Sequence, residues 1–72
     1  MMPLSMLREG ATGTIKELHG KPEMKKHLED LGFISGDTVR VVSQLGGNLI
    51  IEVKGTRLAV NKVMANHVIL AD

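Results

Sequence analysis

The 72-residue sequence predicts a mainly β fold: a small, strongly bent barrel of about five short antiparallel strands, with one α-helix inserted between the first and the second. Between residues 38 and 70, alternating or β-branched apolar runs are separated by turns that contain Gly or Asn. Between residues 23 and 31, apolar residues recur at helical spacing instead. A chain of this length builds one domain, over residues 1–72, and needs nearly all of its apolar side chains in one core.

The first strand is expected over residues 11–18, where Thr and Ile favour an extended backbone. Ile15 and Leu18 are three residues apart, and this break in the period of two predicts a β-bulge or an early end of the strand. Residues 3–10 precede the strand as a lead-in segment, which its two leucines can anchor to the core.

The helix is expected over residues 23–31, after a loop that ends in Pro22, a residue suited to the first helical position. Its apolar residues form one stripe: Met24, Leu28 and Leu31. Its charged side chains fall on the opposite side: Lys25, Lys26, Glu29 and Asp30.

The end of the helix is expected at Gly32, because a left-handed residue commonly closes the last helical turn. Phe33, the only aromatic residue, follows at once and can fold back over Leu28. The Ser-Gly-Asp sequence at residues 35–37 predicts a tight turn, in which Gly36 tolerates a positive φ. The apolar period then falls from helical spacing to alternation, so a strand follows.

The second and third strands are expected over residues 38–44 and 49–54, on either side of a Gly-Gly turn. Alternation divides their side chains between two faces: Val39, Val41, Leu49, Ile51 and Val53 on one, and Arg40, Val42 and Ile50 on the other. One face therefore supplies the core.

Gly55 reverses the chain again, and a short strand over residues 58–60 follows. Asn61 suits the N-cap of a single helical turn, and residues 68–70 alternate as a closing strand. A barrel of the SH3-like kind accommodates this order of elements. An OB-like barrel is the rival, but its helix usually comes later in the chain.

Composition excludes several classes of function. The formal net charge is +1, and one Phe with no Trp or Tyr provides no platform for stacking bases, so we expect no nucleic-acid partner. No cysteine is present for a disulfide or a thiolate metal site. Apolar runs are too short to insert in a membrane, and we expect no secretory signal. A cytoplasmic location is consistent with these features.

The sequence offers few candidates for metal-binding or catalytic residues. The three histidines are scattered, and only His27 has a partner at helical spacing, Glu23, in a pair that would hold a divalent ion weakly. Met24 and Met64 occupy positions typical of a core. No set of acid, base and nucleophile is apparent, so we expect neither catalytic residues, nor a cofactor, nor a tight metal site.

Protein–protein contact is the remaining function, and two sets of residues are candidates. Lys25 and Lys26 lie on the charged side of the helix. Val42 and Ile50 lie on the face opposite the apolar stripe of the strands, where they either form a small exposed patch or are buried at the corners of a curved barrel. A second copy of the chain is also considered as a partner.

Several segments of the sequence follow one another in a recognisable order and spacing. The segment in the middle is the most specific of them: Leu28, Leu31, Gly32, Phe33, Gly36 and Val39. The others cover most of the remaining chain: Pro3, Leu4, Leu7 and Gly10; Val53 and Gly55; residues 57–60; Ala65, Val68 and Leu70. In this order and spacing the segments resemble the FeoA family, small accessory proteins of bacterial ferrous iron transport.

The resemblance implies an SH3-like barrel and a non-catalytic adaptor that contacts FeoB, the membrane permease with a cytoplasmic GTP-binding domain. The same domain type ends the iron-dependent repressors, so a regulatory domain that binds an internal peptide or another subunit is the alternative. An Arg-rich start to the helix is expected in many relatives, and this chain has Lys25, Lys26 and His27 instead. Lysines offer point charges in place of bidentate contacts.

Overall fold

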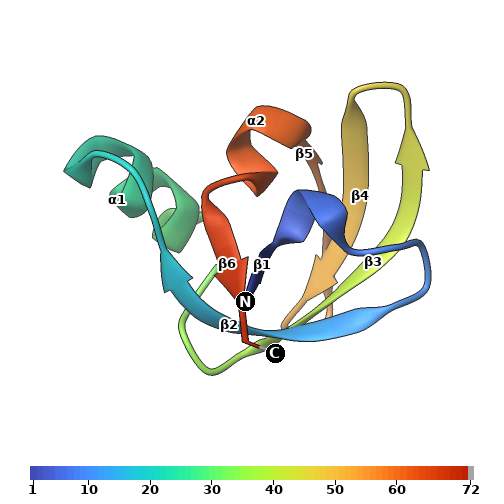
Figure 1. Cartoon of the computed structure of the whole chain (residues 1–72), viewed down its shortest axis with the longest axis horizontal. Helices are drawn as coiled ribbons and strands as arrows, with labels where there is room; N and C mark the ends of the chain where they lie inside the picture. Colours follow the sequence, from blue (N-terminus) through green and yellow to red (C-terminus); the bar gives the residue numbers. More distant parts are fainter. Residues whose placement is uncertain (72) are drawn as a thin grey trace.

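The computed structural model describes residues 1–71 and contains six strands in one antiparallel sheet, in the order β1-β6-β2-β3-β4-β5 (Figure 1). The strands are β1 (Met2–Pro3), β2 (Thr12–Leu18), β3 (Thr38–Leu45), β4 (Asn48–Val53), β5 (Thr56–Asn61) and β6 (Val68–Leu70). The helices are the 3-10 turn η1 (Leu4–Met6), α1 (Pro22–Asp30) and α2 (Lys62–Ala65). The mainly β class, with α1 between the first long strand and the next, is confirmed.

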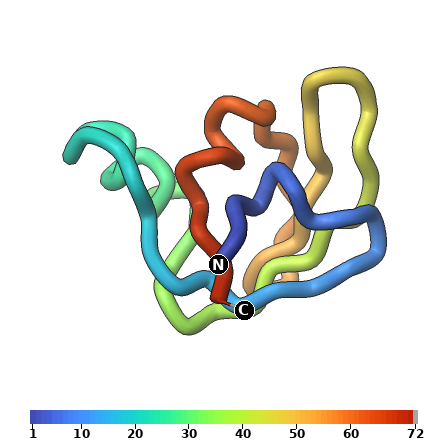
Figure 2. Tube along the Cα trace, in the orientation of Figure 1, coloured from blue at the N-terminus to red at the C-terminus, as the bar shows by residue number. Residues whose placement is uncertain are grey.

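Strand β2 joins the two halves of the sheet. Its first part pairs with β3 and its second part with β6, and the register shifts between Ile15 and Glu17. The extra residue, Lys16, is the β-bulge that the broken period predicts, and a bulge of this kind bends a strand. Figure 2 shows the result, because β2 runs beneath the molecule and then turns upward towards α1.

The expected count of about five strands is one too low. Residues 3–10 were expected to form only a lead-in segment, but Met2 and Pro3 pair with Leu70 and Ile69 as strand β1. The sheet is also not closed into a continuous barrel, since β1 and β5 are the two ends of the strand order. Helix α2 contacts both η1 and β5 between those ends.

The core lies on the inner face of the bent sheet. Val39 and Val41 of β3 are fully buried, as the alternation of the strand predicts. The inner residues of β4 are also buried: Leu49, Ile51 and Val53. Leu4 and Leu7 are buried as well, so the first segment is anchored as expected.

The end of α1 is a complete Schellman motif. The N–H of Gly32 donates to the carbonyl of Glu29 (2.9 Å), and the N–H of Phe33 donates to the carbonyl of Leu28 (3.1 Å). Gly32 has a φ of +110°, whereas Leu31 before it is still helical. Phe33 and Leu28 are both fully buried in the same core. The predicted stop of the helix and the folding back of Phe33 are therefore confirmed.

Replacing Gly32 by Val is expected to lower the free energy of unfolding by about 1–2 kcal/mol. The penalty comes from the backbone, because a β-carbon built at Gly32 meets Val53 only at 3.6 Å, an ordinary contact. Urea denaturation followed by circular dichroism measures the change. An unchanged midpoint would show that the helix ends without the positive φ.

Two further turns depend on positive φ. Gly36 has a φ of +97°, and its N–H donates to the carbonyl of Ile15, which ties the turn after α1 to β2. Lys54 and Gly55 both have positive φ in the two-residue hairpin between β4 and β5, as a type I′ turn requires. The Lys54 ammonium lies 3.3 Å from the carboxylate of Asp37, so the two turns are linked.

Candidate functional site

The outer face of strands β3, β4 and β5 is the first candidate interaction surface, and it carries a row of alternating charges. Glu52 on β4 pairs in register with Arg40 on β3 and with Arg57 on β5. Its carboxylate lies 3.6 Å from the guanidinium of Arg40 and 3.3 Å from that of Arg57. We call these three residues the charged row. It has two cations and one anion, and it ends at β5.

An apolar row lies beside the charged row on the same face: Val42 on β3, Ile50 on β4 and Ala59 on β5. The register shifts between Val41 and Ser43, so Val42 is the extra residue of a bulge next to Ile50. Ile50 in turn pairs with Ala59. Val42 and Ile50 are half-buried, Ala59 is exposed, and none of the three belongs to the core cluster. Of the two alternatives for Val42 and Ile50, the structure favours the outer patch.

Helix α1 carries the other predicted contact residues at one end of the molecule (Figure 1). Lys25 and Lys26 are both exposed, and the Lys26 ammonium lies 3.7 Å from the carboxylate of Asp30 one helical turn on. The hairpin between β3 and β4 lies at the opposite end. The structure therefore places the lysines and the apolar row on different elements, α1 and the strands β3 to β5.

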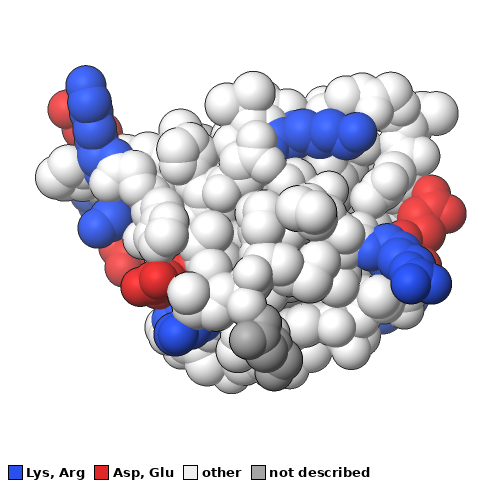
Figure 3. All heavy atoms as spheres, viewed as in Figure 1, with Lys and Arg blue, Asp and Glu red and all other residues white. Residues whose placement is uncertain are grey.

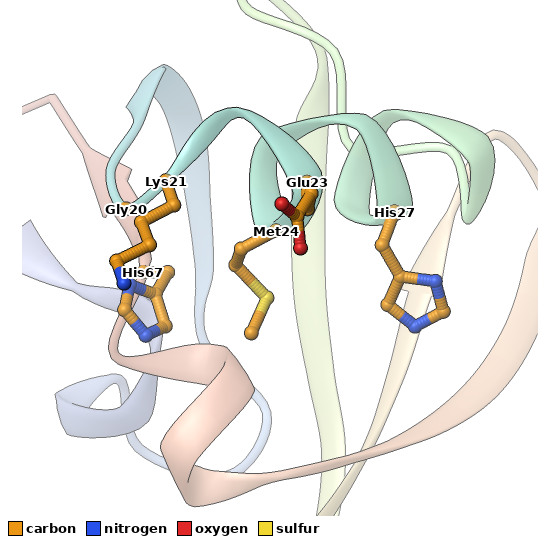
Figure 4. Close-up of a pocket in the computed structure, with 6 residues that line it drawn as sticks. All are labelled: Gly20, Lys21, Glu23, Met24, His27 and His67. Carbon is orange, nitrogen blue, oxygen red and sulfur yellow. The ribbon is translucent and has the colours of Figure 1, made fainter.

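An open hollow of about 560 Å³ lies between the start of α1 and the connection from α2 to β6. Figure 4 shows Met24 pointing into it, with His67 and Lys21 on one side and His27 on the other. Gly20 forms part of its wall, and a β-carbon there would come within 3.1 Å of the His67 imidazole. Met24 and the loop before α1 therefore build a mostly apolar depression, which the sequence did not reveal.

Metal-binding chemistry is sparse on this surface. Among residues 1–71, no three His, Asp or Glu side chains are close enough together to hold a metal ion. His19 bonds to Glu17 (3.0 Å), and His27 and His67 lie on opposite sides of the hollow. Within the same residues, no helix has the length and hydrophobicity needed to cross a membrane.

The face seen in Figure 3 is largely uncharged over η1 and β6, although one basic side chain lies across its upper part near α2, and the other charged side chains gather at its margins. Met6 on η1 and Val63 on α2 are 69% and 65% exposed. The two elements are in contact, and the Ser5 hydroxyl donates to the side chain of Asn66 at the end of α2. Sequence reasoning missed this second apolar surface, because η1 lies in the segment expected to be only a lead-in.

The fold and these surfaces define a small β domain of the SH3-like class. The chain belongs to the FeoA family, since the family model for the FeoA domain matches residues 2–72. No curated protein sequence matches it.

Two solved FeoA structures are similar to the chain over most of their length. An iron uptake regulatory protein (FeoA) is 30% identical, with a TM-score of 0.89, and the match covers 97% of this chain and 93% of that one. FeoA from Stenotrophomonas maltophilia, solved with zinc, is 28% identical, with a TM-score of 0.82, and the match covers 99% and 91%. The latter is described as a prokaryotic SH3 domain protein, and the SH3-like prediction is confirmed.

The fold also occurs in larger regulators. A manganese-dependent transcriptional repressor, solved with manganese, has a TM-score of 0.88 at 19% identity, over 96% of this chain but 35% of the repressor. At that identity the similarity concerns the fold alone. The same fold therefore occurs both in small proteins of about this length and within longer ones.

Proposed function

We propose that the protein is a non-catalytic, cytoplasmic adaptor of ferrous iron uptake, which acts by direct contact with the GTP-binding region of a FeoB-type permease. Membership of the FeoA family over residues 2–72 is the observation that carries this proposal. The Stenotrophomonas maltophilia relative is described as a candidate activating factor of ferrous iron transport. The apolar row with the charged row beside it supplies a surface suited to a protein partner, since partly exposed apolar patches with polar rims mark such sites.

The test is binding to the isolated cytoplasmic GTP-binding region of FeoB from the same genome, measured by biolayer interferometry. Ile50→Glu places a charge in the middle of the apolar row and is expected to weaken binding about tenfold or more. The double variant Lys25→Glu/Lys26→Glu tests α1 in the same way. Wild-type protein is also expected to change the rate of GTP hydrolysis by that region.

Arg8→Glu is the control, because it reverses one exposed charge on a residue that belongs neither to α1 nor to the apolar row. This variant is expected to bind like the wild type. Absence of binding by the wild-type protein at concentrations of about 100 μM would contradict the proposal, because a Kd above that level corresponds to a binding free energy weaker than about −5.5 kcal/mol.

A regulatory domain like that of the metal-dependent repressors is the second candidate. It is favoured by the high TM-scores to manganese-dependent repressors, although their low identities limit the argument to the fold. Such a domain would bind a segment of a transcription factor in place of FeoB, and the same binding experiment separates the two candidates.

A further inference from the structure

Strand β5 has one side that pairs with no strand among residues 1–71, because it ends the strand order. The two-residue turn at Lys54 and Gly55 makes Val53 and Thr56 a hydrogen-bonded pair. The alternation then directs the backbone groups of Leu58 towards β4, and those of Arg57 and Ala59 away from it. The bond from the N–H of Lys62 to the carbonyl of Gly47 (3.0 Å) fits this alternation.

The two ends of the sheet differ in how well they are protected against added strands. At the other end, β1 has only two residues and one of them, Pro3, lacks an N–H. Strand β5 has six residues with neither a proline nor a register shift against β4. Its Ala59 side chain is small and exposed. In the described part of the chain, no strand pairs with the free side of β5, and of the elements beyond the sheet α2, which follows β5 in the chain, contacts this strand.

The charged row indicates what the added strand carries. Charges alternate across β3, β4 and β5 as Arg40, Glu52 and Arg57, with both ion pairs formed. The next position in the row lies beside Arg57 on the free side. An acidic residue there continues the alternation, whereas a basic residue faces Arg57 directly and is repelled. The net charge of the row, two cations to one anion, favours the same choice.

The neighbouring positions on the added strand are fixed by the faces of β5. The residue of the added strand that lies opposite Ala59 is two positions from the acidic residue, on the same outer face. It extends the apolar row beyond Ala59. Between these two positions it faces Leu58, whose side chain is half-buried and packs at the margin of the core. Both positions favour apolar residues.

We propose that the free side of β5 binds an extended segment of another protein by strand addition, and that this segment has an acidic residue opposite Arg57 with apolar residues next to it. Backbone hydrogen bonds to Arg57 and Ala59 supply affinity, and the charged and apolar rows supply the choice of sequence. A second copy of β5 fits poorly, because it contains no acidic residue. The inference does not depend on which protein supplies the strand.

The experiment uses the whole protein and blocked heptapeptides with Val at the four positions around a central Glu, Gln or Lys and Thr at both ends. Two-dimensional ¹H–¹⁵N NMR titrations follow binding, and hydrogen exchange follows the amides of Arg57 and Ala59. The Glu peptide is expected to shift the β5 signals, slow exchange of both amides and bind about fivefold more tightly than the Lys peptide, the size of one cross-strand charge pair.

Arg57→Glu is the decisive variant, because it is expected to reverse the preference so that the Lys peptide binds more tightly than the Glu peptide. Ala59→Pro removes one outward N–H and is expected to abolish binding, with Ala59→Ser as the matched control that keeps it. Unshifted β5 signals with all three peptides at millimolar concentration overturn the proposal. An unchanged preference in Arg57→Glu overturns it as well, and does so whether or not Ala59→Pro folds.

Discussion

Replacing Phe33 by Ala is expected to cost about 3–5 kcal/mol of the free energy of unfolding. Phe33 is among the largest fully buried side chains of the protein and lies directly after the residue that ends α1. Its removal leaves a cavity and also removes the apolar contact that accompanies the Schellman motif at Leu28. Small domains have free energies of unfolding of about 5–15 kcal/mol, and a chain of this length is expected near the lower limit. The variant is therefore expected to be largely unfolded well below the transition temperature of the wild type.

Thermal and urea denaturation measure this effect, with Phe33→Leu as the control. Leucine keeps much of the apolar volume and is expected to remain folded at 25 °C, with a smaller loss of stability. A transition temperature for Phe33→Ala within a few degrees of the wild type would show that Phe33 is not central to packing, because about 1 kcal/mol shifts it by about 4–8 °C in a domain of this size.

Local signals in the sequence explain why much of this fold was predictable. A left-handed closing residue after an apolar helical stripe predicts the end of α1, and Gly32 has the required φ. Alternation predicts which residues of β3 and β4 face the core, and Asn61 caps α2 through its side chain, which accepts from the N–H of Met64. Each of these features depends on residues within a few positions of one another.

Features that depend on distant pairing were not predictable in the same way. Strand β1 exists only because Met2 and Pro3 meet β6, almost the whole chain away, and two residues have no period of their own. The charged row likewise joins Arg40, Glu52 and Arg57 from three strands, and only the register makes them neighbours. The hollow at Met24 and the exposed positions of Met6 and Val63 depend on how the helices pack against the rest of the protein. Local sequence patterns do not predict this packing.

The outer face and the free side of β5 are surfaces that depend on the open, bent sheet. A closed barrel would hide both ends of the strand order, whereas here β5 remains free and the outer face runs to its edge. Val42 and Ile50, predicted as partner contacts, lie in the row that ends at this edge, while Lys25 and Lys26 lie on α1 at the other end of the molecule. Variants of the two sets therefore report on separate surfaces, and their effects on binding are expected to add.

Neighbouring residues of β4 are expected to respond in opposite ways to the same substitution. Ile51→Glu places a carboxylate in the core, where the wild-type side chain is fully buried, and is expected to cost about 4 kcal/mol or more. Ile50→Glu points to the outer face and is expected to cost about 1 kcal/mol or less. Urea midpoints measure both, with Ile51→Val as a control expected to cost about 0.5–1.5 kcal/mol.

The contrast between the two variants tests the register on which the outer face depends. A shift of one residue would exchange the faces of Ile50 and Ile51, because successive side chains of a strand point to opposite sides. The apolar row would then belong to the core, and neither the proposed contact with FeoB nor the proposed added strand beside Arg57 would have a surface to use. Loss of cooperative unfolding in Ile50→Glu, with Ile51→Glu still folded, is the result that contradicts the arrangement described here. If the Ile50→Glu variant stays folded and binds the FeoB region more weakly, Ile50 contributes to partner binding and not to the stability of the core.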